Sequence, residues 1–280
     1  MGSDGSPRAL ISVVVTVRNE ERGVAPLLDS LAGQESPVEI VLVDSESRDR
    51  TVEIAEGYAR RHPGVVRVVA QPGSRGMGRN RGVREARGEL VAFTDGDCIA
   101  DSGWLRALRR GLAEAPVAAG RTVAVGKPAY GHLERVELFQ SGYDVTYPSC
   151  NLAYRRALFE QLGGFDPRFI TAEDIDLNLR AVRAGASIRY LPDAVIYHRM
   201  RATLLRFLYQ AYWNGYGRKQ LTEKQGTLWD RYRIRRLLAG QRTPIAWARL
   251  VAALGGYATR VTTGGNARLT PDVPTESAPK

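Results

Sequence analysis

The chain has 280 residues, and its 44% hydrophobic and 25% charged side chains are typical of a soluble globular protein rather than a fibrous or wholly disordered one. Its two cysteines, Cys98 and Cys150, exclude a disulfide framework and a cysteine-rich zinc site, so a reducing compartment is expected. The start, MGSDGSPRAL, lacks the apolar segment of a signal peptide, which makes the cytoplasm the expected location.

The formal charge of +10 is concentrated in the C-terminal part of the chain. Residues 1–198 contain 25 lysines and arginines against 26 aspartates and glutamates, whereas residues 199–280 contain 15 against 4. A basic segment of this kind suits nucleic acid, an anionic membrane or a phosphorylated substrate. A solvated basic face without a partner is the alternative.

Strands and helices are expected to alternate over the first hundred residues. Continuous apolar runs predict buried strands at 10–17, 38–45, 64–70 and 89–98. The first intervening helix has Val24, Leu27, Leu28 and Leu31 at helical spacing and ends at Gly33. A second helix spans 49–61 with Asp49 as N-cap, and a glycine- and arginine-rich loop with a short helix leads to Gly88. The pattern predicts an α/β fold with a doubly wound, mostly parallel sheet flanked by helices.

The pattern is less regular beyond residue 115. RTVAVG suggests a strand and residues 129–141 a helix. PSCNLAYRRALFEQLGGF is expected to hold a strand end followed by a helix that stops at Gly163-Gly164, and another helix ends at Gly185. IRYLPDAVIYHR is expected to form a strand pair, or one strand broken at Pro192.

A basic helical extension is expected at 199–265, between a catalytic region and a disordered tail at 266–280; residues 1–9 are expected to be flexible. Thr243 is a candidate N-cap, with Pro244 at the first helical position. The helix suits a membrane interface, with Trp247 and Tyr257 at headgroup depth. Packing against the catalytic region or another subunit is the alternative.

Acidic side chains follow the predicted strands at their carboxyl ends, where open α/β sheets bind ligands. Glu20 follows the first strand, Asp44 ends the second, and Asp95 and Asp97 end the fourth. Arg75 and Arg79 lie just before the fourth strand. Carboxylates accept hydrogen bonds from sugar hydroxyls and base N–H groups, and arginines bind phosphate oxygens. An Asp-x-Asp turn suits a divalent ion that bridges a diphosphate.

Residues 11 to about 198 resemble a family 2 glycosyltransferase of the GT-A fold. The order and spacing of five segments carry the resemblance: ISVVVTVRNEE, VEIVLVDSESRDRT, GRNRGVREARGELVAFTDGDC, NLAYRRALFEQLGGFD and EDIDLNLRAVRAG. The resemblance implies a catalytic domain at 10–198, with a nucleotide-binding half at 10–98 and an acceptor half at 99–198.

The resemblance also implies roles for individual residues. The nucleoside would contact Thr16, Val17, Glu20 and Asp44. Asp95 and Gly96 would lie at the ribose, with Arg75 and Arg79 at the leaving diphosphate. Asp97 and His198 would hold the metal, and Glu173 and Asp174 form the acidic pair with Asp174 as base. Asp176 remains an alternative base. Two departures bear on base selectivity: Thr16-Val17-Arg18 replaces the usual Pro-Thr/Ala-Tyr, and DSESRD replaces DDGSxD.

The implied activity is inverting transfer from a UDP- or GDP-sugar to an acceptor hydroxyl or phosphate, including a lipid-linked one such as polyprenyl phosphate, with Mn²⁺ or Mg²⁺. Peripheral membrane contact would use residues 199–260, and the oligomeric state is open. The alternatives are a nucleic-acid or anionic-surface binding protein, and an inactive nucleotide-sugar binding module. A dinucleotide-dependent oxidoreductase is disfavoured, because its glycine fingerprint should follow the first strand, whereas the glycines here follow the third.

Overall fold

The computed structural model describes residues 8–126, 136–199, 203–228, 232, 238, 241 and 243–263. The expected disordered tail at 266–280, all but the end of the flexible N-terminus and most of the expected helix at 129–141 lie outside these residues. Within them, 138–140 are not helical, because Phe139–Gln140 forms a short strand.

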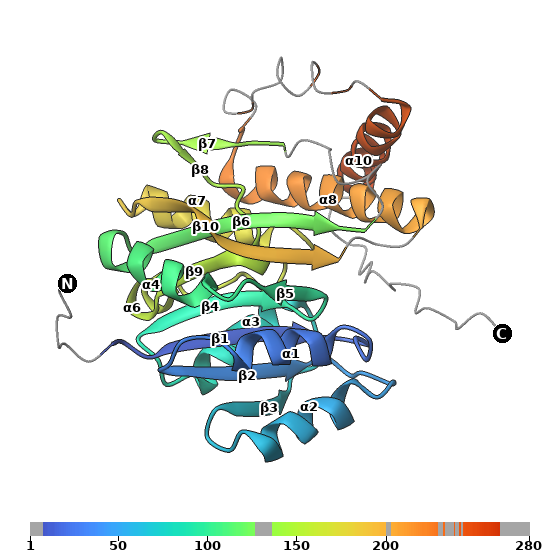
Figure 1. Cartoon of the computed structure of the whole chain (residues 1–280). Helices are drawn as coiled ribbons and strands as arrows, with labels where there is room; N and C mark the ends of the chain where they lie inside the picture. Colours follow the sequence, from blue (N-terminus) through green and yellow to red (C-terminus); the bar gives the residue numbers. More distant parts are fainter. Residues whose placement is uncertain are drawn as a thin grey trace.

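The centre of the molecule is an eight-stranded sheet with the order β3-β2-β1-β4-β9-β6-β10-β5 (Figure 1). Its strands are β1 (Ile11–Val17), β2 (Val38–Asp44), β3 (Val66–Ala70), β4 (Leu90–Asp95), β5 (Cys98–Ala100), β6 (Val117–Val125), β9 (Leu152–Arg155) and β10 (Ile188–Arg199). β1 pairs in parallel with β2 and β4, β2 with β3, and β6 with β10. The predicted α/β fold with a mostly parallel sheet is therefore confirmed. The antiparallel pairing of β9 and of β5 was not expected.

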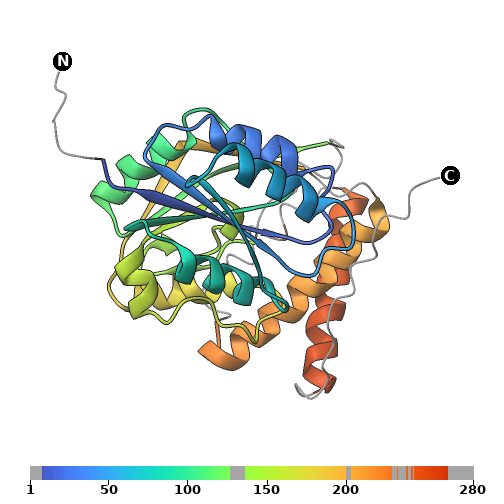
Figure 2. The ribbon, with the colours of Figure 1, turned by 90° about the horizontal axis from the view of Figure 1, so that it is seen from below.

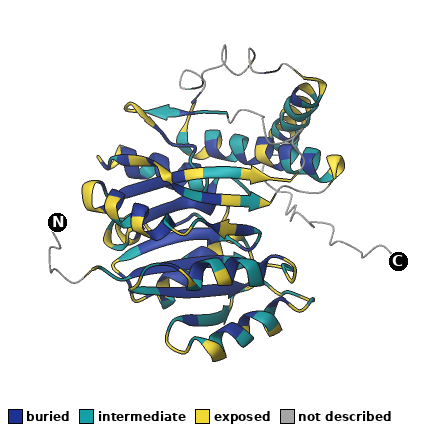
Figure 3. Cartoon of the chain, viewed as in Figure 1, coloured by how far each residue is buried: buried dark blue, intermediate teal, exposed yellow. Residues whose placement is uncertain are grey.

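Helices cover both faces of the sheet (Figure 2). One face packs against α1 (Val24–Ala32), α2 (Thr51–Arg61) and α4 (Trp104–Glu114). The other packs against α3 (Arg75–Glu85), α6 (Arg156–Gln161), α7 (Glu173–Arg183) and α8 (Leu204–Gln225). The strands β1, β2 and β4 are buried on both faces (Figure 3), which explains why they appear in the sequence as continuous apolar runs.

The glycine-rich segment before β4 forms the eleven-residue helix α3, longer than the expected loop and short helix. Its glycines let the helix lie against the sheet. A Cβ at Gly82 would lie 2.3 Å from Val14 Cγ1, and a Cβ at Gly78 would lie 3.0 Å from Thr16 Cγ2. Close packing therefore outweighs the low helix propensity of glycine here.

The end of β4 and the last strand also differ in detail from the expectation. The expected strand at 89–98 is two strands, because the chain turns at Gly96 and Asp97 before β5. The segment around Pro192 is one strand, β10, whose register with β6 shifts between Leu191 and Val195. Its end pairs antiparallel with β5, with His198 opposite Cys98. A hairpin of β7 (Phe139–Gln140) and β8 (Tyr143–Asp144) lies outside the main sheet.

The C-terminal extension contains α8 and α10 (Pro244–Thr263), which pack against each other (Figure 1). Thr243 caps α10 as predicted, because its hydroxyl accepts a hydrogen bond from the Ala246 N–H at 3.2 Å. The helices approach closely at two glycines: a Cβ at Gly215 or at Gly256 would lie 1.8 Å from a backbone oxygen of the other helix. No helix in the described part of the chain is long and apolar enough to cross a membrane.

Candidate active site

Parallel pairing brings the predicted donor-binding residues together at the carboxyl edge of the sheet. Thr16 on β1 is paired with Asp95 on β4, and Val17 is paired with Asp44 on β2. Gly96 lies against the same point, since a Cβ there would be 2.8 Å from Val17 Cγ1 and 2.9 Å from Glu20 Cγ. Five of the eight predicted donor residues therefore form one contiguous surface, and Glu20 borders it.

Asp44 is buried at this edge, and only one of its carboxylate oxygens has a partner. Oδ2 accepts a hydrogen bond from the Ser47 N–H at 3.1 Å. Oδ1 is buried without a partner in the described structure. A buried carboxylate oxygen without a hydrogen bond is unfavourable, so Asp44 has acceptor capacity for a ligand N–H or O–H group.

The loops that follow β1 and β2 are tied to each other. The Asn19 N–H donates to Ser47 Oγ at 2.9 Å, and Asn19 Oδ1 accepts from the Arg48 N–H at 2.8 Å. The Glu20 N–H donates to Thr51 Oγ1 at 2.7 Å. These bonds hold the rim of the donor surface in one arrangement before any ligand arrives.

Arg79 joins the two halves of the catalytic region. Its Nη2 donates to Asp95 Oδ1 at 2.8 Å and its Nη1 to Glu173 Oε1 at 2.7 Å, while the side chain is 1% exposed. Burial alone disfavours the charged guanidinium, but the two carboxylates outweigh it and raise the pKa of Arg79. Arg79 thus links the end of β4 to the start of α7. Arg75, in contrast, is exposed at the first position of α3.

Asp174 lies at the N-terminus of α7, next to Glu173. Its Oδ2 accepts from the Ser149 N–H at 3.0 Å, and its Oδ1 from the Ile175 N–H at 2.8 Å. Burial and the neighbouring Glu173 raise the pKa of Asp174 to about 6, against the opposing effects of these N–H groups and of Arg79. A carboxyl group with this pKa is suited to exchange protons near neutral pH.

Asp176, the alternative base, is fully buried and engaged elsewhere. It accepts from Arg180 Nε at 2.9 Å, from Lys224 Nζ at 2.9 Å and from Gln225 Nε2 at 2.6 Å. These contacts hold α7 against α8, and they give Asp176 a structural role.

Asp97 and His198 meet where β5 pairs with the end of β10. His198 Nε2 lies 3.2 Å from Asp97 Oδ1. Burial lowers the pKa of His198, but the hydrogen bond to Asp97 and its negative charge prevail and raise the pKa to about 9. Ligand atoms of Asp97, Cys98 and His198 all lie within 4.8 Å of one another. The hydrogen bond to Cys150, together with burial, raises the pKa of Cys98, which keeps its thiol protonated.

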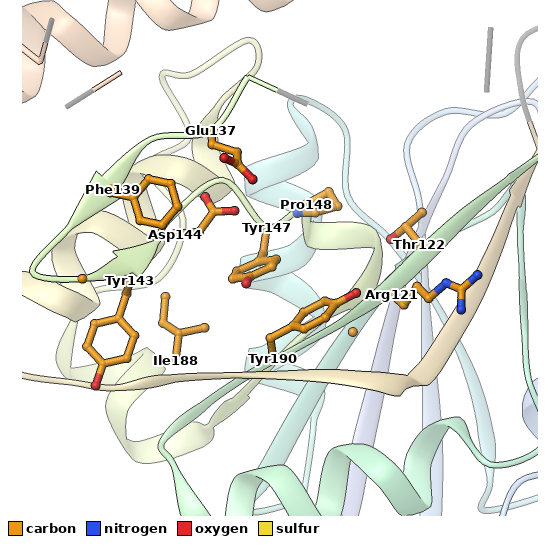
Figure 4. A pocket seen from close by; sticks show the side chains of 12 residues that line it. Arg121, Thr122, Glu137, Phe139, Tyr143, Asp144, Tyr147, Pro148, Ile188 and Tyr190 are labelled. Carbon is orange, nitrogen blue, oxygen red and sulfur yellow. The ribbon is translucent and has the colours of Figure 1, made fainter. Parts of the chain in front are cut away.

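A pocket of about 670 Å³ lies between β6, β10 and the β7–β8 hairpin (Figure 4). Tyrosines line it, including Tyr143, Tyr147 and Tyr190. Pro148 also lines the pocket and precedes Ser149, which binds Asp174. Sequence reasoning missed this pocket, since Tyr190 is more than forty residues away from Tyr143 and Tyr147 in the chain. It also missed Ser149, which acts through its backbone.

The family model for "Glycosyl transferase family 2" matches residues 12–163, more than half of the chain. The chain belongs to glycosyltransferase family 2. A second model, "Glycosyl transferase family group 2", matches residues 132–265, so sequence similarity of this kind extends over the helical extension. The predicted family is thus confirmed.

Curated members of the family match over about two thirds of this chain. The pre-mycofactocin glycosyltransferase of Mycobacterium tuberculosis is 31% identical over 212 residues, which cover 69% of this chain and 43% of that protein. The probable glycosyltransferase YdaM of Bacillus subtilis is 27% identical over 212 residues, which cover 68% and 50%. The chain therefore spans about half the length of these curated relatives.

Solved structures share the fold of this chain. TarS of S. aureus in complex with UDP-GlcNAc superposes with a TM-score of 0.57 at 22% identity, covering 90% of this chain and 81% of that one. The mannosyltransferase PcManGT of Pyrobaculum calidifontis, in complex with GDP-Man and Mn²⁺, gives 0.62 at 22% identity, covering 95% and 78%. These similarities confirm the expected GT-A architecture.

Proposed function

We propose that this chain is an inverting glycosyltransferase that uses a nucleotide diphosphate sugar as donor. The observation that carries the proposal is the meeting of Asp44 and Asp95 with Thr16 and Val17 at one sheet edge, linked through Arg79 to the acidic pair on α7. Residues 10–98 bind the nucleotide in this proposal, and residues 99–198 bind the acceptor.

The nucleoside lies against Thr16, Val17 and Glu20, with its base at Asp44. The partnerless Asp44 Oδ1 accepts a hydrogen bond from a ring N–H, which both uracil and guanine provide. UDP- and GDP-sugars are therefore both candidates, in keeping with the UDP-GlcNAc and GDP-Man complexes of the fold relatives. Asp95 and Gly96 lie at the ribose, and Arg75 at the diphosphate.

The residues around Asp97 suit a divalent cation. The Asp97 carboxylate oxygen and the His198 imidazole nitrogen lie 3.2 Å apart. Both could bind Mn²⁺ or Mg²⁺ once the ion displaces the imidazole proton, and the diphosphate and water would complete the shell. Asp97 and His198 would hold the ion, since oxygen and nitrogen donors suit these cations better than the thiol of Cys98 does. When bound, the ion would neutralise charge on the leaving diphosphate.

Asp174 acts as the general base. The acceptor hydroxyl gives its proton to the Asp174 carboxylate while its oxygen bonds to the anomeric carbon. The bond from that carbon to the diphosphate oxygen breaks at the same time, and the configuration inverts. The Ser149 and Ile175 N–H groups orient the carboxylate, and Glu173, held by Arg79, raises the Asp174 pKa.

Thermal unfolding with a panel of UDP-, GDP- and dTDP-sugars, each with and without Mn²⁺ or Mg²⁺, tests the donor. A ligand that binds only the folded protein raises the melting temperature. We expect one nucleotide class to do so in a metal-dependent way, with the metal dependence lost in Asp97→Ala. Asp97 is partly exposed at a turn, so the variant is expected to fold. An unchanged melting temperature with every nucleotide sugar would contradict the proposal.

The helical extension is proposed to contact an anionic membrane at the cytoplasmic face. α10 exposes Trp247, Val251, Leu254 and Val261, and the start of α8 exposes Leu204 and Leu205. Exposed apolar side chains on a basic helical segment suit the interface of a membrane. A lipid-linked acceptor would then be delivered to the catalytic domain from that surface.

A further inference from the structure

The pocket between β6, β10 and the β7–β8 hairpin has an aromatic wall. The rings of Tyr147 and Tyr190 are stacked, with centroids 5.5 Å apart and planes 12° from parallel. Tyr190 remains 44% exposed, and Tyr143 is 36% exposed. Figure 4 shows the paired rings at the centre of the pocket, with Phe139 further along the same wall. A rigid tyrosine pair presents a flat apolar surface and ring hydroxyls to a ligand.

The charges around this wall disfavour a phosphate. Two carboxylates, those of Glu137 and Asp144, line the pocket, and Arg121 is the one cationic side chain among its lining residues. Figure 4 shows the Glu137 carboxylate turned from the rim toward the Tyr147 ring. Carboxylates accept hydrogen bonds from hydroxyl groups and repel phosphate oxygens. A flat face beside carboxylates therefore suits a neutral molecule with C–H bonds on one side and hydroxyls at its edge.

The pocket borders the segment that contacts the proposed base, Asp174. Pro148 forms part of its wall, and the next residue donates its N–H to Asp174 Oδ2 at 3.0 Å. Its volume, about 670 Å³, is in the range of ligand pockets and exceeds what ordered water alone requires.

We propose that this pocket binds a pyranose ring of the acceptor, stacked on the Tyr190–Tyr147 pair with its hydroxyls toward Glu137. The inference rests on the proposed glycosyltransferase function and narrows its acceptor to a glycan or glycoside. A lipid-linked acceptor would present a sugar hydroxyl, not a lipid phosphate, to Asp174.

The test is saturation-transfer NMR on the full chain with methyl pyranosides of the gluco, manno, galacto and N-acetylglucosamine series, and with dodecyl phosphate as the phosphate probe. We expect transfer to ring C–H protons of at least one pyranoside, with affinity about 3- to 10-fold weaker in Tyr190→Ala, as the loss of one aromatic contact implies. Tyr190→Phe should keep the binding, and Glu137→Gln should weaken it. Tyr197→Ala removes a tyrosine of similar exposure from the same strand outside the pocket, and should leave glycoside binding unchanged.

Nucleotide binding is measured in the same samples, so the two proposals can fail separately. Nucleotide binding without Tyr190-dependent pyranoside binding would overturn the sugar pocket alone. Binding of dodecyl phosphate that depends on Tyr190 would overturn it as well. Pyranoside binding that depends on Tyr190, without binding of any nucleotide, would keep the pocket and reject the donor proposal.

Discussion

At the scale of a single side chain, the nucleotide affinity should depend on Asp44, because its Oδ1 is buried without a partner. Asp44→Asn replaces one acceptor oxygen with an N–H donor group of the same size. A hydrogen bond to a charged group contributes about 1.5–3 kcal/mol, so the dissociation constant for UDP or GDP should rise about 10- to 100-fold. Calorimetric titration measures it. Glu46→Gln, on the exposed part of the same loop, is the control and should bind nucleotide normally.

The pKa of Asp174 predicts how the transfer rate depends on pH. With its pKa raised to about 6, the proposed base Asp174 would be protonated and inactive at lower pH, so nucleotide release from the donor should rise with pH through about 6 and then level. Asp174→Asn should reduce the rate by about 10²-fold or more, with nucleotide affinity kept. A variant that stays active would show that another carboxylate is the base.

The same pKa has a consequence for stability. The folded state binds the Asp174 proton more tightly than the ordinary value of 3.8 implies, so the contribution of this group to stability is largest at low pH and is lost as the pH rises through about 6. Asp174→Asn removes this unfavourable charge, but its NH2 group would face either the Ser149 or the Ile175 N–H, so its melting temperature at pH 7 should stay close to that of the wild type. Asp176→Asn should melt lower, because it weakens a buried network with Arg180 and Lys224.

The positions of the site residues could be predicted from the sequence, but many of their contacts could not. Asp44, Asp95 and Asp97 lie along one edge of the sheet because each ends a strand or follows one, and strand ends can be recognised from apolar runs. The position of Arg79 between two carboxylates could not be predicted, because Glu173 is 94 positions away. A role at the leaving diphosphate thus stays a prediction for Arg79, whose Nη1 and Nη2 both bind carboxylates here.

At the scale of an element, a glycine-to-alanine change in α3 has two opposing effects on stability, one through helix propensity and one through packing against the sheet. Gly82→Ala gains helix propensity of up to about 1 kcal/mol, but its Cβ would lie 2.3 Å from Val14 Cγ1, and overpacking costs about 1–3 kcal/mol. The variant should therefore be destabilised. Gly57→Ala on α2 is the matched control, since its nearest neighbour is 3.9 Å away, and it should be stabilised by about 0.5–1 kcal/mol. Urea unfolding of both variants measures the difference, and a stabilised Gly82→Ala would contradict the packing of α3.

The elements that were predicted and those that were missed differ in length and in composition. β1 and β2 are buried runs of seven residues and β3 is a partly buried edge strand, and the expected bounds of all three agree with the structure to within two residues. β5, β7, β8 and β9 have two to four residues each, too few to show a period. α3 was expected to be mostly loop because its glycines favour turns, and contact with β1 reverses that preference.

For the whole molecule, the uneven charge predicts salt-dependent attachment to anionic vesicles. Each basic side chain near such a surface contributes about 1 kcal/mol, and the exposed apolar side chains of α10 add to it. Trp247 is 49% and Val251 65% exposed, so a double change, Trp247→Ser with Val251→Ser, should weaken attachment by about tenfold or more without disturbing the core. Co-sedimentation with anionic and neutral vesicles at low and high salt measures this.

The control is Met77→Ser, which removes an exposed apolar side chain from α3 on the catalytic domain. Attachment should be unchanged in that variant. If the wild-type chain ignores anionic vesicles, residues 199–260 are better explained as a subunit contact.

The class of the protein was predictable from the order of its motifs, whereas the surface that meets a partner depends on which side chains folding leaves exposed.

The pairing of β5 with β10 places the proposed metal ligands on strands that are far apart in the sequence, since His198 lies opposite Cys98. During synthesis, Asp97 leaves the ribosome about a hundred residues before His198. β1 to β4 can meanwhile pair through short connections, but β5 gains its partner only when β10 is inserted beside β6. The nucleoside surface can therefore form early, and the metal pair forms last. On the proposed assignment, a nascent chain that stops before β10 would have the nucleoside surface but not the pair of metal ligands, so the order of folding would delay donor turnover until β10 is in place.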